Sequence, residues 1–146
     1  MKIKFEVWGR IRRPLPRVFR AVQDPKELSR YFTTGGASGP LQTGKTVYWD
    51  FADFPGKFPV VVKRVVKNQS ILLAWGSAIG GRNQVFFKFK KISPRSTELR
   101  IQESGWPNSQ RGQKAAFGNC MGWSQMLAAL KVWCEHGINL RDGFYK

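Results

Sequence analysis

The sequence predicts an α+β domain in which one long helix lies across a curved antiparallel sheet. Three observations support this class. Helix signals follow a single strand near the start, short β segments dominate the middle, and the end is a long helix with a wide apolar face. The 146 residues have the size of one domain and their 42% apolar content fits a packed core, so we expect a single domain over 1–146.

The chain begins with a strand and two short helices. The stretch "KIKFEVW" (2–8) alternates apolar and polar residues, which is typical of a half-buried strand. Within 16–32, apolar residues recur at helical spacing on both sides of Asp24. Because Asp24 can cap a helix that has Pro25 at its first position, we expect one helix before this pair and another after it.

A glycine-rich connection, "TTGGASGPLQTG" (33–44), comes next. It lacks the Gly-Lys-Ser/Thr ending of a phosphate-binding loop and is not placed between a strand and a helix. We therefore expect a mobile loop here.

Strand signals dominate the middle of the chain. β-branched and aromatic residues fill five short segments, each bounded by Gly, Pro, Asn or Ser: 46–51, 59–67, 70–76, 84–92 and 97–103. The short separators between the last four segments indicate hairpins, and hence an antiparallel meander. A loop that contains Trp106 and Pro107 should follow.

The chain closes with a helix near 111–136, which Gly137 can end. Its stretch "GWSQMLAALKVWC" (122–134) carries a single charge, Lys131, in a chain of net charge +16. At about 100° per residue, the apolar side chains of this helix cover an arc of roughly 160°. They are Trp123, Met126, Leu127, Ala129, Leu130, Trp133 and Cys134. We expect this face to lie against the inward faces of the strands.

Several stretches in a fixed order match a known family: "PRVFRAVQDPKELSRYF" (16–32), "LQTG" (41–44), "ILLAW" (71–75), "STELRIQESGW" (96–106) and "GWSQMLAALKVW" (122–133). With them the chain resembles the homologues of the activator of the ninety-kilodalton heat-shock chaperone ATPase. That family is a branch of the START-like (SRPBCC) helix-grip superfamily, which also contains polyketide cyclases and plant pathogenesis-related proteins. Tyr31 departs from the family pattern, which usually has Trp there.

The resemblance implies a helix-grip fold, with a strand, two helices, six further strands and a long C-terminal helix gripped by a curved sheet of about seven strands. It also implies a cavity between that helix and the sheet. Members bind lipids, sterols, polyketides or other apolar molecules, and some catalyse cyclisation or hydrolysis in the cavity. We therefore expect binding of a hydrophobic or amphipathic small molecule, lipid-like or polyketide-like, between helix and sheet.

The candidate ligand-binding residues are side chains expected on the inward faces of the strands and of the last helix. They are Trp49, Phe51, Arg64, Trp75, Phe87, Phe89, Trp123, Met126, Leu127 and Leu130. A packed core uses the same residue types as a ligand cavity, so the sequence leaves open whether these side chains enclose a ligand or fill the space.

Arg64 is the polar member of this set. Lys63 and Arg64 are neighbours in a predicted strand, so in regular pleating one of them points inward, and the flanking valines favour Arg64. A buried cation needs a partner, and a ligand carboxylate or phosphate could supply it. A β-bulge, a twisted strand end or pairing with Glu103 would explain the sequence equally well.

Few residues could carry catalysis. Among nine acidic residues the least implausible catalytic acids are Glu103 and then Asp53, which keeps a cyclase or hydrolase acting in the cavity as a third candidate function. A surface or rim position is the simpler interpretation for both, since Asp and Glu are seldom fully buried. No pair of nucleophile and base is recognisable, so we lean against an enzyme. One histidine and no Cys-x-x-Cys predict no metal site, and we expect no cofactor.

The charge favours an alternative function. The chain has 25 Lys and Arg against nine acidic residues, which is typical of proteins that meet a polyanion. The strongest basic clusters are 10–13 with Arg17 and Arg20, and Lys88 with Lys90 and Lys91. No helix-turn-helix, zinc finger or RNA-binding signature with stacking aromatics is recognisable in the sequence. The alternative is a basic interaction module for a polyanion or an acidic protein partner, including a chaperone-cofactor role that only the resemblance suggests.

Localisation is predicted from what the sequence does not contain. No run approaches the ~18 apolar residues of a transmembrane segment. Cys120 and Cys134 would lie about 21 Å apart on a helix, too far for a disulfide, which suits a reducing compartment. We expect a cytoplasmic protein.

Overall fold

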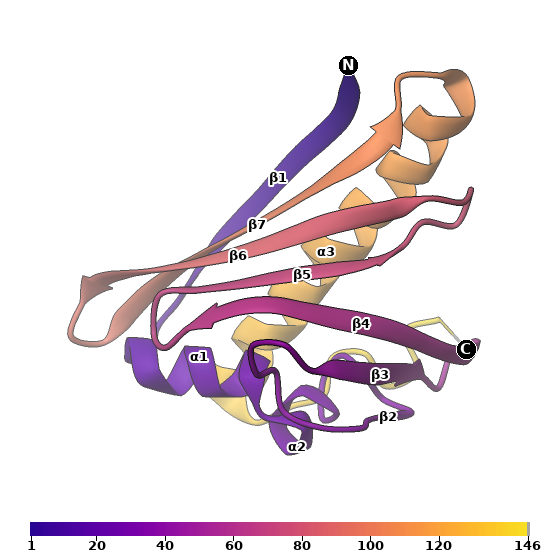
Figure 1. Ribbon diagram of the computed structural model, residues 1–146. Coiled ribbons are helices and arrows are strands. Elements are labelled where there is room, and N and C mark those ends of the chain that lie inside the picture. Colours follow the sequence, from indigo (N-terminus) through magenta and orange to yellow (C-terminus); the bar gives the residue numbers. More distant parts are fainter. Residues whose placement is uncertain (146) are drawn as a thin grey trace.

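The computed structural model describes residues 1–145, without the side chain of Pro55. Seven strands form one antiparallel sheet in the order β1-β7-β6-β5-β4-β3-β2, and α3 runs diagonally behind it (Figure 1). The elements are β1 (Lys2–Ile11), α1 (Leu15–Gln23), α2 (Pro25–Leu28), β2 (Gly36–Ala37), β3 (Thr46–Phe51), β4 (Phe54–Val66), β5 (Ser70–Gly76), β6 (Arg82–Ser93), β7 (Ser96–Pro107) and α3 (Gln110–His136). The predicted α+β helix-grip class and its antiparallel meander are confirmed.

The helix ends follow the signals in the sequence. The backbone N–H of Lys26 donates to the side chain of Asp24 at 2.9 Å, and Pro25 opens α2. Gly137 ends α3 in the left-handed conformation with φ 68°, which glycine adopts without strain. None of the helices formed by residues 1–145 is long and apolar enough to cross a membrane.

Two local predictions are wrong. Trp106 and Pro107 were expected in a loop, but β7 extends through both because β1 pairs with it as far as Lys2 and Pro107. The expected loop over 33–44 contains a short strand, since Gly36–Ala37 pair with β3. A Cβ at Gly35 would lie 2.8 Å from the side chain of Asp50, so glycine at that position permits the close approach of β2.

The apolar face of α3 is buried as expected. Trp123, Met126, Leu127, Ala129, Leu130 and Cys134 all belong to the buried core. The helix packs most extensively on β1, with further contacts to β7 and α1. Its diagonal path leaves the inner side of β3, β4 and β5 to be covered by other groups.

Two glycines of α3 should respond oppositely to alanine. A Cβ at Gly112 would lie 1.9 Å from the carbonyl oxygen of Pro107, so Gly112→Ala must displace the helix from the strand end. This should lower the free energy of unfolding by about 1–3 kcal/mol. A Cβ at Gly118 meets no atom within 4 Å, so Gly118→Ala should raise the free energy of unfolding by about 0.5–1 kcal/mol. Urea denaturation measures the free energy of unfolding of both variants. If the two substitutions changed it in the same direction, this packing would be contradicted.

The thiol of Cys134 makes the stability depend on alkaline pH. Burial raises its pKa from 9.0 to about 11, so the folded state holds the thiol proton that the unfolded chain releases in this range. The unfolded state then binds fewer protons, and stability falls as pH rises. We expect Cys134 to account for a loss of about 2 kcal/mol between pH 8 and 10.5.

Urea titrations of the wild type and Cys134→Ala at the two pH values test this. The control is Cys120→Ala, which removes the half-buried free thiol of the same helix. Tyr31, whose pKa is also raised, first by burial and then by the charge of Cys134, is present in all three proteins, so the difference between wild type and Cys134→Ala reports Cys134 together with its coupling to Tyr31. A stability gap between wild type and Cys134→Ala that stays constant with pH would contradict the expectation.

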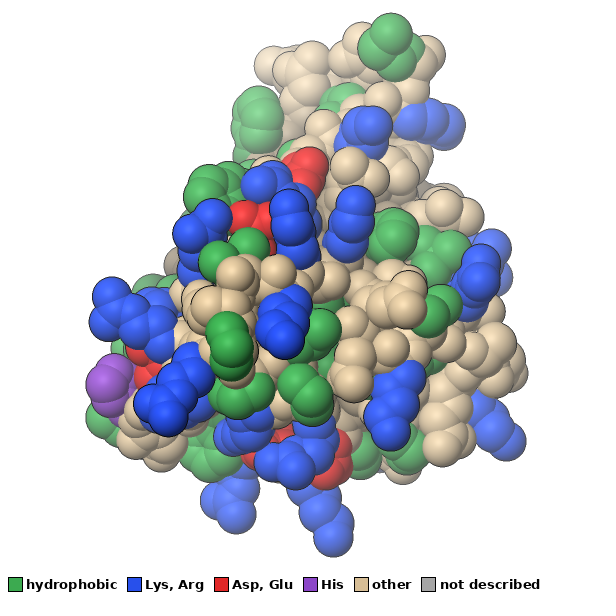
Figure 2. All heavy atoms as spheres, turned by 90° about the vertical axis from the view of Figure 1, so that its left-hand side faces the viewer, with side chains coloured by type: hydrophobic (Ala, Val, Ile, Leu, Met, Phe, Trp, Pro, Cys, Tyr) green, Lys and Arg blue, Asp and Glu red, His purple; other side chains and the backbone are tan. Residues whose placement is uncertain are grey.

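The basic residues lie on the surface. Lys and Arg dominate the end of the molecule that carries α1 and the β6–β7 turn, with few acidic groups among them (Figure 2). Exposed cations there include Arg20, Lys67, Lys90, Lys91 and Arg95.

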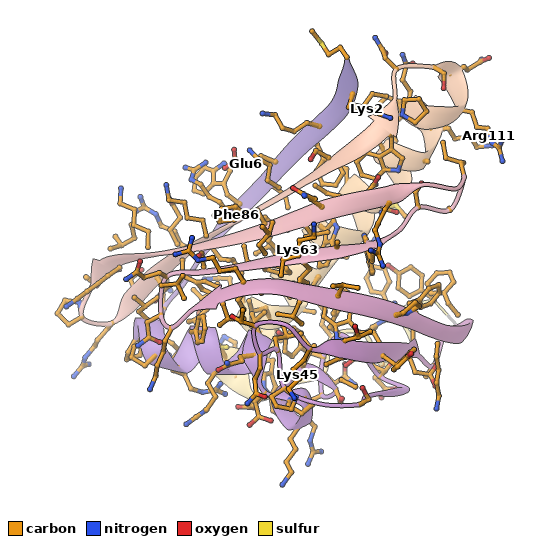
Figure 3. The ribbon with its side chains drawn as sticks, viewed as in Figure 1. Lys2, Glu6, Lys45, Lys63, Phe86 and Arg111 are labelled. Atoms are coloured by element: carbon orange, nitrogen blue, oxygen red, sulfur yellow. The ribbon has the colours of Figure 1, made fainter. Side chains whose placement is uncertain are left out.

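Strict alternation made Arg64 the inward candidate and left a β-bulge open as an alternative; the inward placement is wrong, and the structure shows the bulge. The pairing of β4 with β5 shifts register between Val62 and Arg64, which is a β-bulge. Lys63 and Arg64 are both exposed, and Figure 3 shows Lys63 on the face of the sheet turned away from α3. The bulge removes the strict alternation on which the inward assignment depended.

Candidate ligand-binding pocket

A pocket of about 590 Å³ opens between α3 and the inner side of β3, β4 and β5. This volume falls within the range of about 300–1,000 Å³ that is usual for small-molecule sites. Its walls are Phe32, Phe51, Phe54, Phe58, Pro59, Trp75, Gly76, Ser77, Ala78, Gly118, Asn119, Met121, Gly122, Trp123, Arg141 and Tyr145. Most of the side chains are aromatic, and the last two close the pocket from the C-terminal segment.

The pocket exists because α3 presents little volume on this side. Gly118 and Gly122 lie one turn apart on the helix and both line the space. A Cβ built at either one has no neighbour within 4 Å. Glycine costs about 1 kcal/mol relative to alanine inside a helix, so this pair lowers helix stability while leaving room beside it.

An aromatic cluster forms the floor of the pocket. The ring of Trp123 lies 5.4 Å from Phe32, 5.5 Å from Trp75 and 5.5 Å from Phe87, measured between ring centroids. Phe51 continues the cluster, 5.0 Å from Phe32 and 5.8 Å from Phe58. Such edge and tilted contacts stabilise each ring, so the floor is formed before any ligand arrives.

Glu103 lies directly beneath this floor and is fully buried. Trp123 Nε1 donates to its Oε1 at 2.7 Å and Trp75 Nε1 to its Oε2 at 3.0 Å. Asn83 Nδ2 donates to Oε2 at 3.0 Å, and Asn119 Nδ2 lies within 3.1–3.2 Å of both oxygens. The carboxylate therefore has four neutral donors, which offset the cost of burying it.

The expected rim position of Glu103 is wrong. Its backbone pairs with Phe5 on one side and Val85 on the other, in the same inward set as Leu99 and Ile101. Glu103 does not line the pocket, but three of its donors do: Trp75, Asn119 and Trp123. The geometry thus lets Glu103 hold pocket walls in place rather than touch a ligand.

Asp53, the other candidate acid, is engaged in an ion pair. Arg141 donates through Nε and Nη2 to the two carboxylate oxygens of Asp53, each at 3.0 Å, and both side chains are about 10% exposed. The guanidinium also lies 5.1 Å from the ring centroids of Phe51 and Tyr145. This contact fastens the C-terminal segment to the β3–β4 turn. Within residues 1–145, no three His, Cys, Asp or Glu side chains form a metal-ligand group.

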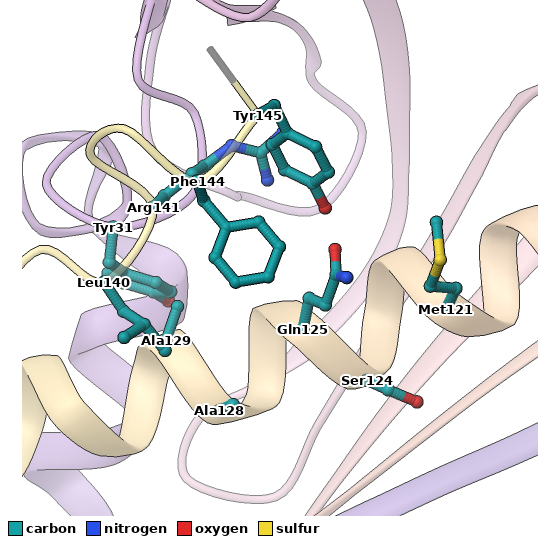
Figure 4. Close-up of a pocket in the computed structure, with 10 residues that line it drawn as sticks. All are labelled: Tyr31, Met121, Ser124, Gln125, Ala128, Ala129, Leu140, Arg141, Phe144 and Tyr145. Carbon is teal, nitrogen blue, oxygen red and sulfur yellow. The ribbon is translucent and has the colours of Figure 1, made fainter.

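A second pocket of about 270 Å³ lies beside the first (Figure 4). Figure 4 shows Phe144 and Tyr145 facing Gln125 and Met121 of α3 across it. Met121, Arg141 and Tyr145 line both pockets and so separate them.

The ion pair of Asp53 should control how firmly the C-terminal segment is held. Asp53→Asn keeps the shape but removes the charge, and local opening of the C-terminal segment then returns Arg141 to water, so amide hydrogen exchange in 138–145 should accelerate about tenfold. Asp142→Asn makes the same change at an exposed neighbouring position and should leave the exchange rates unchanged. Equal exchange in wild type and Asp53→Asn would contradict the fastening role.

The ten predicted ligand-binding residues divide into three groups. Phe51, Trp75 and Trp123 line the pocket. Six others are buried in the core and lie outside the pocket lining; Leu127 also borders a hollow of about 260 Å³ against β1. These six are Trp49, Phe87, Phe89, Met126, Leu127 and Leu130. Arg64 lies on the opposite face of the sheet.

Much of the pocket wall was not predicted from the sequence. The missed side chains come from the segment after α2, from the β4 end, from the helix face beside the apolar arc and from the C-terminal segment: Phe32, Phe54, Phe58, Asn119, Met121, Arg141 and Tyr145. The glycines at 118 and 122 were the available signal, because two glycines one turn apart in a helix interior indicate that something occupies or needs the space.

Comparisons with known proteins agree with this architecture. The family described as "Activator of Hsp90 ATPase homolog 1-like protein" matches residues 12–135. A crystal structure from Staphylococcus saprophyticus is similar with a TM-score of 0.79 and 23% identity, covering 95% of this chain and 96% of that one. The solution structure of the Aha1 dimer from Colwellia psychrerythraea has a TM-score of 0.75 and 18% identity, over 92% and 98% of the chains. At these identities the likeness shows the fold.

A further similar structure is DynU16, a putative protein in the dynemicin biosynthetic locus. It has a TM-score of 0.75 and 27% identity, over 92% of this chain. This chain spans 48% of DynU16. No curated protein matches the sequence significantly.

Proposed function

This chain belongs to the Activator of Hsp90 ATPase homolog 1-like family, and we propose that the aromatic pocket between its helix and sheet binds an apolar or amphipathic small molecule. The observation that carries the proposal is the pocket of about 590 Å³, walled mainly by aromatic rings on a preformed floor. Flat aromatic walls favour a ligand with a ring system of its own, since offset and edge contacts between rings add to the gain from burial.

The charges around the pocket favour a neutral ligand. The charge of Arg141 is already neutralised by Asp53, and the carboxylate of Glu103 is occupied by four donors. The polar groups that remain on the wall, such as Ser77 and the amide of Asn119, can orient a carbonyl or hydroxyl group. A ligand with one or two such groups on an apolar ring system fits this lining.

The geometry favours binding without catalysis. Among the residues that the structure describes, none of those lining the pocket is Asp, Glu or His. Both acids considered for a cyclase or hydrolase hold other protein groups, Glu103 under the floor and Asp53 in its ion pair. No observation supports the catalytic alternative over simple binding.

A titration with N-phenyl-1-naphthylamine tests the proposal. This dye is neutral and aromatic, and its fluorescence rises when it leaves water. We expect saturable binding at one site per chain, with an affinity that stays the same between 50 and 200 mM salt, since no ion pair forms. A signal that does not saturate, or that falls with salt as binding to the basic surface would, contradicts the proposal.

A further inference from the structure

The face of the sheet turned away from α3 carries exposed aromatic side chains. Trp8 on β1 is 55% exposed and Phe86 on β6 is 36% exposed. Figure 3 shows this face toward the viewer, with Phe86 and Lys63 projecting from it. Large exposed rings on a sheet face need an explanation, because such positions usually carry polar side chains.

Basic residues lie near both rings in the sheet register, while the direct partners of Phe86 are Leu72 and Gln102. Lys88 pairs across to Arg100, which pairs across to Trp8. In the adjacent row, Arg64 faces Leu72 and Leu72 faces Phe86. Lys63 stands beside Arg64 because the β-bulge in β4 turns both outward.

The acidic side chains of this region pair with Arg100 and not with the neighbouring lysines or Arg64. Glu6 and Glu98 both bind Arg100, at 3.2 and 3.0 Å. Elsewhere Glu27, Asp53 and Glu135 pair with other cations, and Glu103 is buried. Within residues 1–145, Lys4, Lys63, Arg64 and Lys88 form no ion pair, and all four are exposed.

Trp8 is also held in a fixed position. The guanidinium of Arg100 lies 5.0 Å from the centroid of its ring, and Arg100 is itself held by the two carboxylates. Trp8 and Phe86 are separated by two strand spacings across the sheet and by two residues along the strand direction. These separations place them about 12 Å apart. Two rings at this distance, with cations beside and between them, form one surface, here called the outer-face platform.

We propose that the outer-face platform, defined by Trp8, Lys63, Arg64, Phe86 and Lys88, binds single-stranded nucleic acid. The cations bind successive phosphates and the two rings stack on unpaired bases, which is how strand-tracking surfaces combine charge with aromatic groups. A membrane surface would call for a contiguous apolar patch, whereas charged and polar side chains separate these rings. Protein interfaces also use aromatic rings, but a nucleic-acid strand supplies a phosphate and an unpaired base at each nucleotide, which matches cations interspersed with rings.

The basic end of the molecule extends this surface. Lys90 and Lys91 continue β6 beyond Lys88 toward the β6–β7 turn, where Arg95 is exposed. Figure 2 shows Lys and Arg gathered at this end. A strand that crosses the platform along β6 therefore stays in contact with cations after it passes the two rings.

Fluorescence anisotropy with labelled dT12 and U12 oligonucleotides tests the proposal. For about four phosphate contacts, affinity should fall about 50-fold between 50 and 200 mM salt. Lys63→Glu with Lys88→Glu should weaken binding at least tenfold at fixed salt, and Trp8→Ala with Phe86→Ala about tenfold. All these side chains are exposed, and thermal melting by circular dichroism confirms that each variant is folded.

Two matched controls lie on α3. Arg111→Glu with Lys114→Glu makes the same charge change at exposed positions, and Phe117→Ala removes a ring that is 71% exposed. Both should leave affinity within about twofold of the wild type. Dye binding in the pocket should be unchanged in every platform variant, so failure of this proposal and failure of the proposed function are distinguishable.

Three results would overturn the proposal. The first is an equal loss of affinity in the two charge-reversal variants, which means that net charge alone drives binding. The second is unchanged affinity in Trp8→Ala with Phe86→Ala, which makes the surface a general polyanion site of the kind heparin occupies. The third is binding to vesicles that contain phosphatidylserine without binding to either oligonucleotide.

Discussion

Replacing Glu103 with alanine should lower the free energy of unfolding by about 3–5 kcal/mol, which is large for a single substitution. The substitution removes the acceptor for four side-chain donors, those of Trp75, Asn83, Asn119 and Trp123. Each donor left unpaired in a buried place costs about 1–3 kcal/mol, and water that enters from the pocket offsets part of the sum. Urea denaturation followed by circular dichroism measures the loss.

Glu103→Gln separates the effect of charge and geometry from that of volume. The amide keeps the size of the side chain but turns one acceptor oxygen into an NH₂ donor that faces other N–H donors. We expect a loss of about 2 kcal/mol, smaller than for alanine. In Glu103→Ala, water that enters from the pocket reaches the indoles of Trp75 and Trp123, so the tryptophan emission should also shift to longer wavelength in that variant.

Glu6→Ala is the control for Glu103→Ala. Glu6 lies on the exposed face of the sheet in an ion pair with Arg100 whose two side chains are 39% and 37% exposed, so its loss should cost less than about 1 kcal/mol. If Glu103→Ala were as mild as Glu6→Ala, the buried carboxylate would not be the anchor of the pocket floor.

Replacing Gly122 with leucine should abolish most of the dye binding while making the protein more stable. The new side chain extends into open space inside the pocket, where a Cβ meets no atom within 4 Å. Leucine favours the helix over glycine by nearly 1 kcal/mol, so the free energy of unfolding should rise by about that amount. Affinity for N-phenyl-1-naphthylamine should fall at least about tenfold because the leucine occupies ligand space.

Gln113→Leu is the matched control. It adds an exposed leucine to the same helix at a position outside all three pockets, so dye affinity should stay at the wild-type value. The combination of gained stability and lost binding is informative, since a variant that merely damages the fold loses both. Undiminished dye binding by Gly122→Leu would show that the dye binds elsewhere.

The sequence predicts the main elements well because their signals are local. Alternation identifies the long strands, and Asp24, Pro25 and Gly137 mark helix ends through interactions within a few residues. The short β2 could not be predicted, because two residues carry no periodicity. Its pairing depends on Gly35 approaching Asp50, which lies fifteen residues further along the chain.

The site is predicted less completely because it is assembled from distant segments. Alternation with Leu99 and Ile101 already places Glu103 inward, but its donors come from three other elements, and the rarity of buried acids outweighed the pattern. The wall residues Arg141 and Tyr145 belong to a segment without regular structure, so no periodicity marks them. At Arg64 a single bulged residue reverses the facing that alternation predicts.

A crystal structure of the protein with N-phenyl-1-naphthylamine tests the central claim most directly. The account predicts the dye between Trp75, Trp123 and Phe58, with its rings against the aromatic floor and the Asp53–Arg141 ion pair intact beside it. Dye bound only outside this pocket, or side chains of the surrounding walls filling the space in the crystal, would contradict it.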